Sequence, residues 1–593
     1  MPRLRLLFTA VIGSSRRRSA ARVGRALSPR GALALQSVDG ALSFALRAAL
    51  AMALPALPMA LAGRADQAVY AMLGSFTTTF GRNLPYARRA RVLALVAAAM
   101  TACVGCGSAL AAWAHPRDGG AGAAVVVAAM AAVAGIAKLA CDAARLSGLG
   151  AVLLLFSFAV AANGSPAPAD VLPHTALAAL GAAVAWVLAV SGWFVHPDRP
   201  QRLAVAAALR ELADLVEATG AGDGSGLVRH RATAAVLQAY RTLGLLPPTA
   251  AERGGRGGTC VRLTDLSWSL LIGAARRPPD DPTRLARDLR RQVRLLVSRR
   301  HRVPRLLPEL SPPSLVAQAG MASVAGPEPV PADPTARRAA ELRAAELVTG
   351  RRPGGPGHVS VLLVPALRMA IGTGLAGGAA LLLGLGHAYW AAISAAAVLH
   401  SINVRTAAQR AVQRTLGTVA GLMLALGVLS ARPDPVVLVL VIVLLEFLLE
   451  YVVARNYGLG VVFLTPLALL LSDLASPSPA GALVEDRALS SLLGIAIALA
   501  CALLVVHDHA AVRAERALAA CTVASERAEQ VLDVRSEPSY PIVQTHLAAA
   551  VVELREADDA AAGELWPAEI DPTELAAAEQ RAYHLLERLV RGR

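Results

Sequence analysis

Long apolar stretches, separated by short polar turns, fill two parts of the chain. In the first part they cover residues 41–62, 67–81, 92–114, 121–138, 147–163 and 172–195, and in the second part further stretches lie between residues 361 and 506. Most approach or exceed the roughly 17 residues that a helix needs to cross a bilayer. They are too apolar for barrel strands, and backbone groups in lipid must bond internally. The pattern predicts an all-α polytopic membrane protein with about twelve transmembrane helices.

Two other regions contain no stretch long enough to span a membrane. Residues 196–358 and 507–593 carry apolar residues at helical spacing with charged residues between them, which is typical of amphipathic helices. Clusters of proline and glycine interrupt the first of these regions. The sequence therefore predicts five parts: a basic cytoplasmic tail (1–40), a six-helix membrane unit (41–195), a cytoplasmic helical insert with flexible linkers (196–358), a second six-helix membrane unit (359–506) and a cytoplasmic helical C-terminal domain (507–593).

The composition agrees with this class. Hydrophobic residues make up 55% of the 593 residues, charged residues make up 17%, and the mean hydropathy is +0.51. A soluble protein of this size could not bury so much apolar surface and still cover itself with polar groups. Lipid is therefore the simpler solvent for the chain.

The positions of the basic residues predict the orientation. Connectors on the N-terminal side of the membrane carry Arg82, Arg88, Arg89, Arg91, Lys138, Arg145, Arg405, Arg410, Arg414 and Arg455, whereas the opposite turns carry only Arg64, Arg117, Arg432 and Arg487. Because cytoplasmic connectors collect Lys and Arg, both termini and the insert are predicted to be cytoplasmic, in an inner or plasma membrane. The net charge of +16 follows from this topology, so we expect no nucleic-acid partner.

The two membrane units resemble each other. Tyr70 and Arg91 are separated by as many residues as Tyr389 and Arg410. Each unit also has an arginine in its first apolar stretch and a basic connector after its second. Six spans in each unit preserve the orientation, so the sequence predicts two parallel six-helix repeats with a pathway between them.

Arg47 and Arg368 are the arginines inside these first apolar stretches. A charge deep in a span costs roughly 2.5–3.5 kcal/mol on insertion scales, so such a residue usually has a partner or a function. One interpretation is an anion site, since a guanidinium matches a carboxylate bidentately. The other is a side chain that snorkels to the headgroups. The sequence leaves both open.

The basic connector of the second unit supplies further candidates. It carries Arg405, Arg410 and Arg414 and runs into Thr418, where the ninth apolar stretch begins. A basic vestibule raises the local concentration of anions. We therefore treat these three arginines and Thr418 as candidates for a substrate pathway.

An aromatic pair, Tyr389 and Trp390, begins the eighth apolar stretch at its outer end. Trp and Tyr are enriched at membrane interfaces, so one interpretation is an interfacial anchor. The alternative is a surface on which an aromatic substrate stacks.

A pair of acidic residues lies in the tenth apolar stretch. Glu446 and Glu450 are one helical turn apart, and Glu446 is well inside the apolar run. Intramembrane carboxylates often relay protons, so both are candidates for proton coupling. The alternative is a structural pair with an arginine of a basic connector.

Signatures of enzymes and of metal sites are missing or lie in unsuitable places. Lys138 is the only lysine and no glycine precedes it, so the chain has no Walker A motif and no classical ATPase of its own. Cys103 and Cys106 have the CxxC spacing of redox and zinc sites, but they lie in an apolar stretch without a nearby histidine. We expect no catalytic activity, no metal and no cofactor.

The second membrane unit resembles the FUSC family, a group of fusaric acid resistance proteins and aromatic acid exporters. The matching features are Arg368, the pair Tyr389 and Trp390, the connector from Arg405 to Arg414 with Gly417, Thr418 and Gly421, and the run Arg455, Asn456 and Tyr457 followed by VFLTP at 462–466. The first unit has Tyr70 without a following tryptophan and resembles a degenerate copy.

The resemblance implies export of aromatic or other small organic acids, driven by the proton gradient, through two six-helix units with cytoplasmic helical domains. Plant malate channels are similar in fold, so a passive organic-anion channel is an alternative. A second alternative is a non-transporting envelope scaffold whose insert and C-terminal domain recruit partners. Besides the anionic substrate, the partners considered are membrane lipids, a second copy of the chain and, as for some exporters of the group, a periplasmic adaptor protein.

Overall fold

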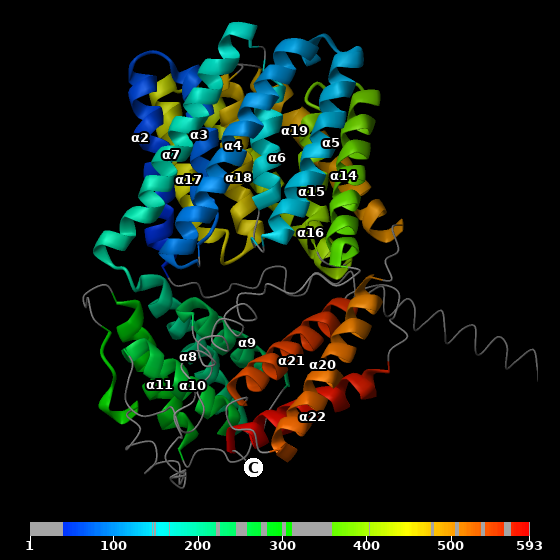
Figure 1. Ribbon diagram of the computed structural model, residues 1–593. Helices are drawn as coiled ribbons and strands as arrows, with labels where there is room; N and C mark the ends of the chain where they lie inside the picture. Colours follow the sequence, from blue (N-terminus) through cyan, green and yellow to red (C-terminus); the bar gives the residue numbers. More distant parts are fainter. Residues whose placement is uncertain are drawn as a thin grey trace, which may run out of the picture.

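The computed structural model describes residues 40–82, 84–144, 146, 150–164, 166–220, 226–244, 258–273, 281–298, 304–310, 358–401, 404–475, 479–504, 509–534, 540–562 and 571–591. Within these ranges the chain forms nineteen α-helices and no strand. The helices build a membrane domain and an extramembrane domain below it (Figure 1). The predicted basic tail, apart from Gly40, lies outside the described residues, as does most of the predicted linker sequence of the insert.

Two sets of six helices build the membrane domain. The first set comprises α2 (Ala41–Leu61), α3 (Ala65–Ser75), α4 (Tyr86–Ala114), α5 (Gly120–Ala143), α6 (Gly150–Ala162) and α7 (Val171–Val195). The second set comprises α14 (His358–Leu382), α15 (Tyr389–Leu399), α16 (Val404–Ser430), α17 (Pro435–Val452), α18 (Tyr457–Ala475) and α19 (Ala480–Leu504). In the described part of the chain, nine of these helices are long and apolar enough to cross a membrane. The predicted all-α polytopic membrane protein is thereby confirmed.

Three helices are shorter than the full spans that the sequence predicts. The helices α3 and α15 have 11 residues each and α6 has 13. At 1.5 Å per residue they cover at most about 20 Å of a hydrocarbon core of about 30 Å. All residues of α6 and α15 are buried. Longer helices surround them, so their residues do not face lipid, and non-helical backbone at membrane depth is tolerated where it is buried in protein or lines a cavity.

The same packing recurs in both sets. The fourth helix of each set, α5 or α17, packs against the first helix of the other set, α14 or α2. The short second helices α3 and α15 pack against the sixth helices α7 and α19. Glycines permit these close contacts: a Cβ atom at Gly494 would lie 2.3 Å from the carbonyl oxygen of Ala391. This is the relationship that two parallel repeats predict.

The extramembrane domain combines two regions that the sequence predicts as separate. It comprises α8 (Arg199–Gly220), α9 (Gly226–Leu243), α10 (Thr259–Gly273), α11 (Pro282–Val297), α20 (His509–Val534), α21 (Tyr540–Ala562) and α22 (Pro572–Arg591). One apolar core contains residues from both regions, among them Leu209 and Tyr240 of the insert and Leu585 of the C-terminal region. The two regions therefore fold against each other.

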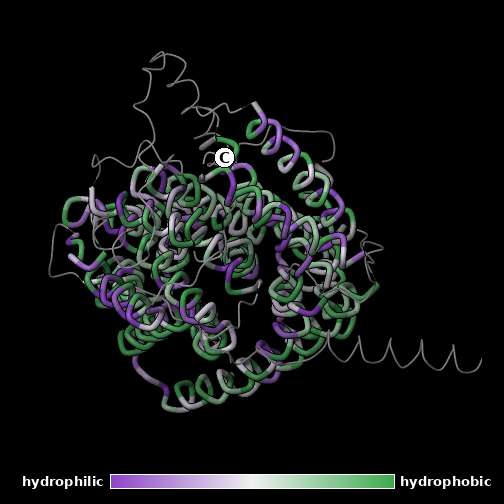
Figure 2. Tube along the Cα trace, turned by 90° about the horizontal axis from the view of Figure 1, so that it is seen from below, coloured by the Kyte–Doolittle hydropathy of each residue, from purple (hydrophilic) through white to green (hydrophobic). Residues whose placement is uncertain are grey.

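The membrane domain has two distinct ends. We call the end next to the extramembrane domain the proximal face and the opposite end the distal face. Seen from the proximal side, long hydrophobic stretches run along the helices at the rim (Figure 2). Large apolar side chains of the membrane helices, such as Leu95, Ile136 and Leu416, are exposed, which is the surface that lipid would cover.

Candidate functional site

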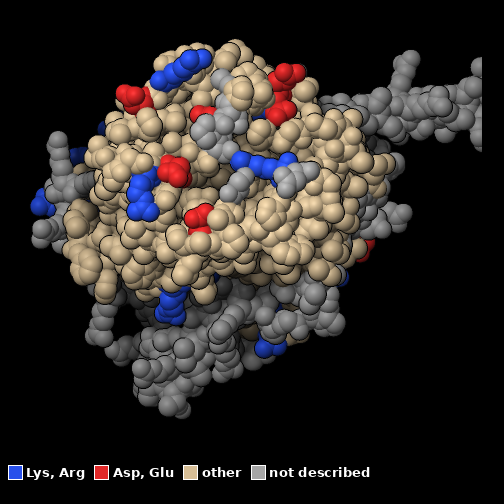
Figure 3. Space-filling view, turned by 90° about the horizontal axis from the view of Figure 1, so that it is seen from above, with Lys and Arg blue, Asp and Glu red and all other residues tan. Residues whose placement is uncertain are grey.

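A cavity of about 1090 Å³ lies at the distal end of the membrane domain, between the two sets of helices. Small residues of α5 and α14, including Ala123, Gly374 and Gly378, form one wall, and Val160 of α6 and Ser472 of α18 contribute to the others. Charged side chains are sparse on the surrounding distal face (Figure 3). A mostly apolar concave site with a few polar groups is the usual form of a small-molecule site.

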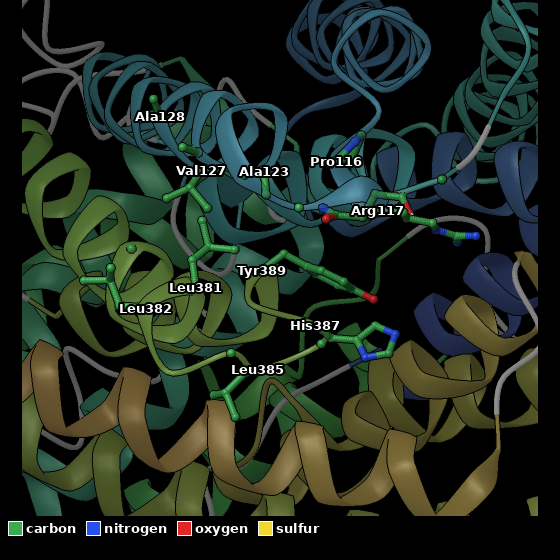
Figure 4. Close-up of a pocket in the computed structure, with 18 of the residues that line it drawn as sticks. Pro116, Arg117, Ala123, Val127, Ala128, Leu381, Leu382, Leu385, His387 and Tyr389 are labelled. Carbon is green, nitrogen blue, oxygen red and sulfur yellow. The ribbon is translucent and has the colours of Figure 1, made fainter.

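Several polar side chains line this cavity, and three of them are labelled in Figure 4. Arg117, His387 and Tyr389 all line it, and the tip of Tyr389 lies between the other two in Figure 4. The Tyr389 hydroxyl donates a hydrogen bond to Ser472 Oγ at 3.3 Å, and His387 Nδ1 lies 2.8 Å from Asp486 Oδ2. The turn between α14 and α15 is thereby attached to both α18 and α19. Arg117 and His387 were not among the candidates predicted from the sequence.

Tyr389 forms the floor of the cavity, and Trp390 packs directly against it. The two side chains are 6% and 0% exposed, and their ring centroids are 4.6 Å apart. Trp390 also contacts Phe156 of α6, with ring centroids 6.2 Å apart. A fully buried tryptophan does not anchor at a membrane interface, so that interpretation is wrong for Trp390. Stacking of an aromatic substrate stays a prediction.

Two buried arginines lie against α15. The guanidinium carbon of Arg487 is 3.9 Å from the ring centroid of Trp390. Arg414 donates from Nη1 to the Tyr457 hydroxyl at 3.2 Å and from Nη2 to Ser394 Oγ at 3.3 Å. Trp390 and Ser394 are one turn apart on α15, so both guanidinium groups lie on the same face of this helix. Arg414 and Arg487 are 1% and 2% exposed.

The position of Arg487 corrects the sequence interpretation, which placed it in a distal turn. The helix α19 begins at Ala480, so Arg487 lies inside it. The two acidic residues Glu485 and Asp486 are typical of a loop sequence. In the structure, however, Asp486 lies next to His387, and only Glu485 of the two is exposed. A helical spacing of small and polar residues could have revealed this helix earlier, since Leu483, Arg487, Ser490, Ser491 and Gly494 recur every three or four residues.

The other predicted arginines have separate environments. Arg368 Nη2 donates to the carbonyl oxygen of Ser401 at 2.8 Å, just beyond the C-terminal end of α15. Basic side chains commonly satisfy the carbonyl groups left open at a helix end. Arg405 is exposed, and the guanidinium of Arg410 lies 5.6 Å from the Tyr457 ring centroid. Arg414 is therefore buried inside the membrane domain, whereas Arg405 is not.

Thr418 belongs to a helix contact. A Cβ atom at Gly417 would lie 2.7 Å from the carbonyl oxygen of Gly458, and one at Gly421 would lie 2.8 Å from that of Val462. These glycines let α16 pack closely against α18. Thr418 is 4% exposed, and its Oγ1 has no hydrogen-bond partner.

The two predicted acidic residues lie in a second buried cluster, toward the proximal face. Glu446 and Glu450 are each 1% exposed. Arg82 Nη2 lies 2.7 Å from Glu450 Oε2, while Glu446 Oε2 has no hydrogen-bond partner. The guanidinium carbons of Arg82 and Arg47 lie 3.8 and 4.5 Å from the ring centroid of Phe44. Glu450 therefore has the connector arginine that one sequence interpretation anticipated.

Metal ligands do not cluster in the part of the chain that the structure describes. No group of three or more His, Cys, Asp or Glu side chains there could hold a metal ion. Cys103 and Cys106 are free thiols on α4.

Comparisons with known proteins agree with this architecture. Residues 375–501, from α14 to α19, match the family described as fusaric acid resistance protein-like. The chain is 25% identical over 478 residues to the uncharacterized membrane protein YvaC of Bacillus subtilis (strain 168), and this alignment covers 76% of the chain and 71% of that protein. No solved structure matches the chain. The matched range contains Tyr389, Trp390, Arg414 and Arg487.

Proposed function

We propose that this chain, a member of the fusaric acid resistance protein-like family through its residues 375–501, is a membrane transporter of small organic anions. Aromatic carboxylates are the substrate class that we favour. The proposed direction is export from the cytoplasm, coupled to the proton gradient. Both termini and the extramembrane domain would then be cytoplasmic, in an inner or plasma membrane, as the distribution of arginines predicts.

The observation that carries this proposal is the distal cavity. It lies between two interlocked sets of membrane helices, and transporters with internal repeats bind their substrates at the interface between the repeats. Its walls are mostly apolar, its floor is the Tyr389 ring, and Arg117 supplies a positive charge at its edge. These features suit a ligand with an aromatic ring and a carboxylate.

The buried acidic cluster supports coupling to protons. A carboxylate held inside a membrane domain without a hydrogen-bond partner on one oxygen, as at Glu446, can exchange a proton as the protein changes conformation. Glu446 and Glu450 are on α17, which packs against α2 of the other set. Movement between the two sets would change the surroundings of both carboxylates.

The closed floor favours an alternating-access transporter over the passive channel. Tyr389 and Trp390 are almost completely buried, so no open passage continues from the cavity past these two residues. A transporter opens such a barrier on one side at a time.

The experiment is a flux measurement in proteoliposomes with labelled benzoate, with and without an imposed pH gradient. The test variant is Gly378→Leu, since Gly378 lines the cavity and a Cβ atom there would meet nothing within 4 Å. The matched control is Gly427→Leu on α16, a second helical glycine with open space and no part in this cavity. We expect the cavity variant to lose at least about nine-tenths of the flux and the control to keep it.

Each outcome separates the candidate functions. Uphill accumulation that depends on the pH gradient and exceeds the accumulation in protein-free liposomes supports the coupled transporter, because neutral benzoic acid also crosses a bilayer by itself. Flux that only dissipates the benzoate gradient favours the channel. Absence of flux for benzoate and for a panel of aliphatic carboxylates would contradict transport and favour the scaffold. Equal flux in the two leucine variants would show that the distal cavity is not on the pathway.

A further inference from the structure

We infer that Arg414 and Arg487 form a binding site for one small monovalent anion, behind the aromatic floor of the distal cavity. Any role of this site in transport rests on the proposed function. The site itself does not, because anion binding can be measured on the purified protein without flux.

The first argument is that two buried positive charges lack an acidic partner. Within the described residues, neither Arg414 nor Arg487 has an ion pair with Asp or Glu, and the two lie within electrostatic reach of each other. The acidic residue next in sequence to Arg487 is Asp486, whose carboxylate faces His387 at 2.8 Å. Arginine does not give up its proton in proteins, so these charges need a counter-charge in a water-poor interior.

The second argument is that hydrogen-bond donors remain unused at this place. Nε of Arg414 and both Nε and Nη1 of Arg487 are buried and have no partner. The hydroxyl groups of Thr418, one turn after Arg414 on α16, and of Ser490, nearly one turn after Arg487 on α19, also have none. Buried donors are almost always satisfied in native proteins, so this concentration of open donors indicates a missing acceptor.

The third argument is the depth of the site and its separation from the cavity. Arg414 lies ten residues after the start of α16, about 15 Å along its axis, and three residues before the middle of this 27-residue helix. Binding sites of repeat-built transporters lie near the bilayer midplane, to which the middle of a spanning helix corresponds. The Trp390 ring contacts Arg487, and the Tyr389 ring contacts both Trp390 and the cavity. This aromatic pair therefore separates the arginines from the cavity and would have to move for an anion to pass.

The chemistry favours a single small anion. The planar guanidinium groups match a carboxylate bidentately, and a halide can also accept several N–H donors. A carboxylate would come from the substrate, whereas a chloride ion would be a resident counter-ion. Binding measurements distinguish these two sources.

The experiment follows thermal unfolding of the full-length protein in detergent, in a zwitterionic buffer free of small anions. Sodium benzoate or sodium chloride is titrated into wild type, Arg414→Gln, Arg487→Gln and the control Arg432→Gln. Arg432 is exposed in the turn between α16 and α17 and takes no part in the site. A ligand that binds only the folded protein raises the unfolding temperature in a saturable manner.

We expect benzoate, chloride or both to raise the unfolding temperature of wild type and of the Arg432→Gln variant. Removal of either buried arginine should weaken the apparent affinity by at least about tenfold, since a charge-assisted hydrogen bond is lost. Without anions, the two glutamine variants should unfold no earlier than wild type, because an unpaired buried charge is removed. Stabilisation by benzoate that chloride abolishes would identify a substrate carboxylate, and stabilisation by chloride alone would identify a counter-ion.

The inference is overturned if neither anion stabilises wild type, or if all four proteins respond alike. Should the glutamine variants fail to fold, Arg487→Lys serves instead. The lysine keeps the positive charge but lacks the planar guanidinium, so this variant should retain chloride binding and bind benzoate more weakly. A response identical to wild type for both anions would contradict the site. Binding without flux would overturn the proposed transport and leave this site standing, whereas flux without binding would do the reverse.

Discussion

Arg82 Nη2 lies 2.7 Å from Glu450 Oε2, and this bond joins the connector after α3 to the proximal end of α17. The partners are 368 residues apart and belong to different sets of helices. The side chain of Glu450 is 2% exposed and that of Arg82 is 20% exposed. The bond is therefore a mostly buried link between the two halves of the membrane domain.

Removing one partner of this ion pair should destabilise the protein more than replacing both partners. Arg82→Met or Glu450→Leu alone leaves an uncompensated charge and should each cost about 3–5 kcal/mol, whereas the double variant should recover part of that loss. The measurement is a double-mutant cycle on unfolding in detergent. Additive effects of the two substitutions would show that the pair does not act as a unit.

Glu446 differs from Glu450 in having an oxygen without a hydrogen-bond partner, which makes it the residue of choice for testing coupling. Glu446→Gln keeps the shape of the side chain and removes its ability to carry a proton. We expect the variant to transport benzoate down its own gradient and to lose at least about tenfold in accumulation driven by a pH gradient. The control is Glu485→Gln, which changes an exposed residue of α19. Undiminished gradient-driven accumulation in the Glu446 variant would exclude this carboxylate from coupling.

The sequence predicted the long membrane helices well because lipid imposes a simple length and polarity. The helices α2, α4, α5 and α7 contain apolar stretches at the predicted places. The same rule overestimated α3, α6 and α15, because helices that other helices surround do not have to span the hydrocarbon themselves.

The candidate site was predictable only in part. The in-span and connector arginines, the aromatic pair and the acidic pair were all visible as residues that lipid disfavours or that carry specific chemistry. Their partners were not visible, since Arg82 finds Glu450 and His387 finds Asp486 across long separations in the chain. Arg487 was misplaced because its acidic neighbours resembled a loop, although the packing of α19 against α15 buries it.

Arg368 should act mainly on stability rather than on substrate affinity. Its guanidinium donates to the carbonyl oxygen of Ser401 at the end of α15, so Arg368→Met removes a charge-assisted hydrogen bond worth about 1.5–3 kcal/mol. We expect a lower unfolding temperature and an unchanged KM for benzoate flux. Arg88→Met, which alters an exposed arginine of α4, is the control for loss of one positive charge. A large rise of KM without loss of stability would instead favour the anion-site interpretation of Arg368.

His230 of α9 should make the extramembrane domain sensitive to acid. Burial lowers the pKa of His230, although Glu556, Asp559 and Glu579 oppose this effect, and Arg555 adds to it. An unfolded histidine has a pKa of about 6.5, so below this pH the unfolded chain binds more protons than the folded domain and stability falls. The stabilising contribution is complete above about pH 6.5 and is lost as the pH falls toward the lowered folded value. We expect the unfolding temperature of wild type to fall as the pH is lowered from about 7.5 to 5.5, and the unfolding temperature of the His230→Gln variant to fall less. The control is His584→Gln, which changes a side chain that is 68% exposed and should give the same pH dependence as wild type. Identical pH profiles for the two glutamine variants would show that His230 does not control this response.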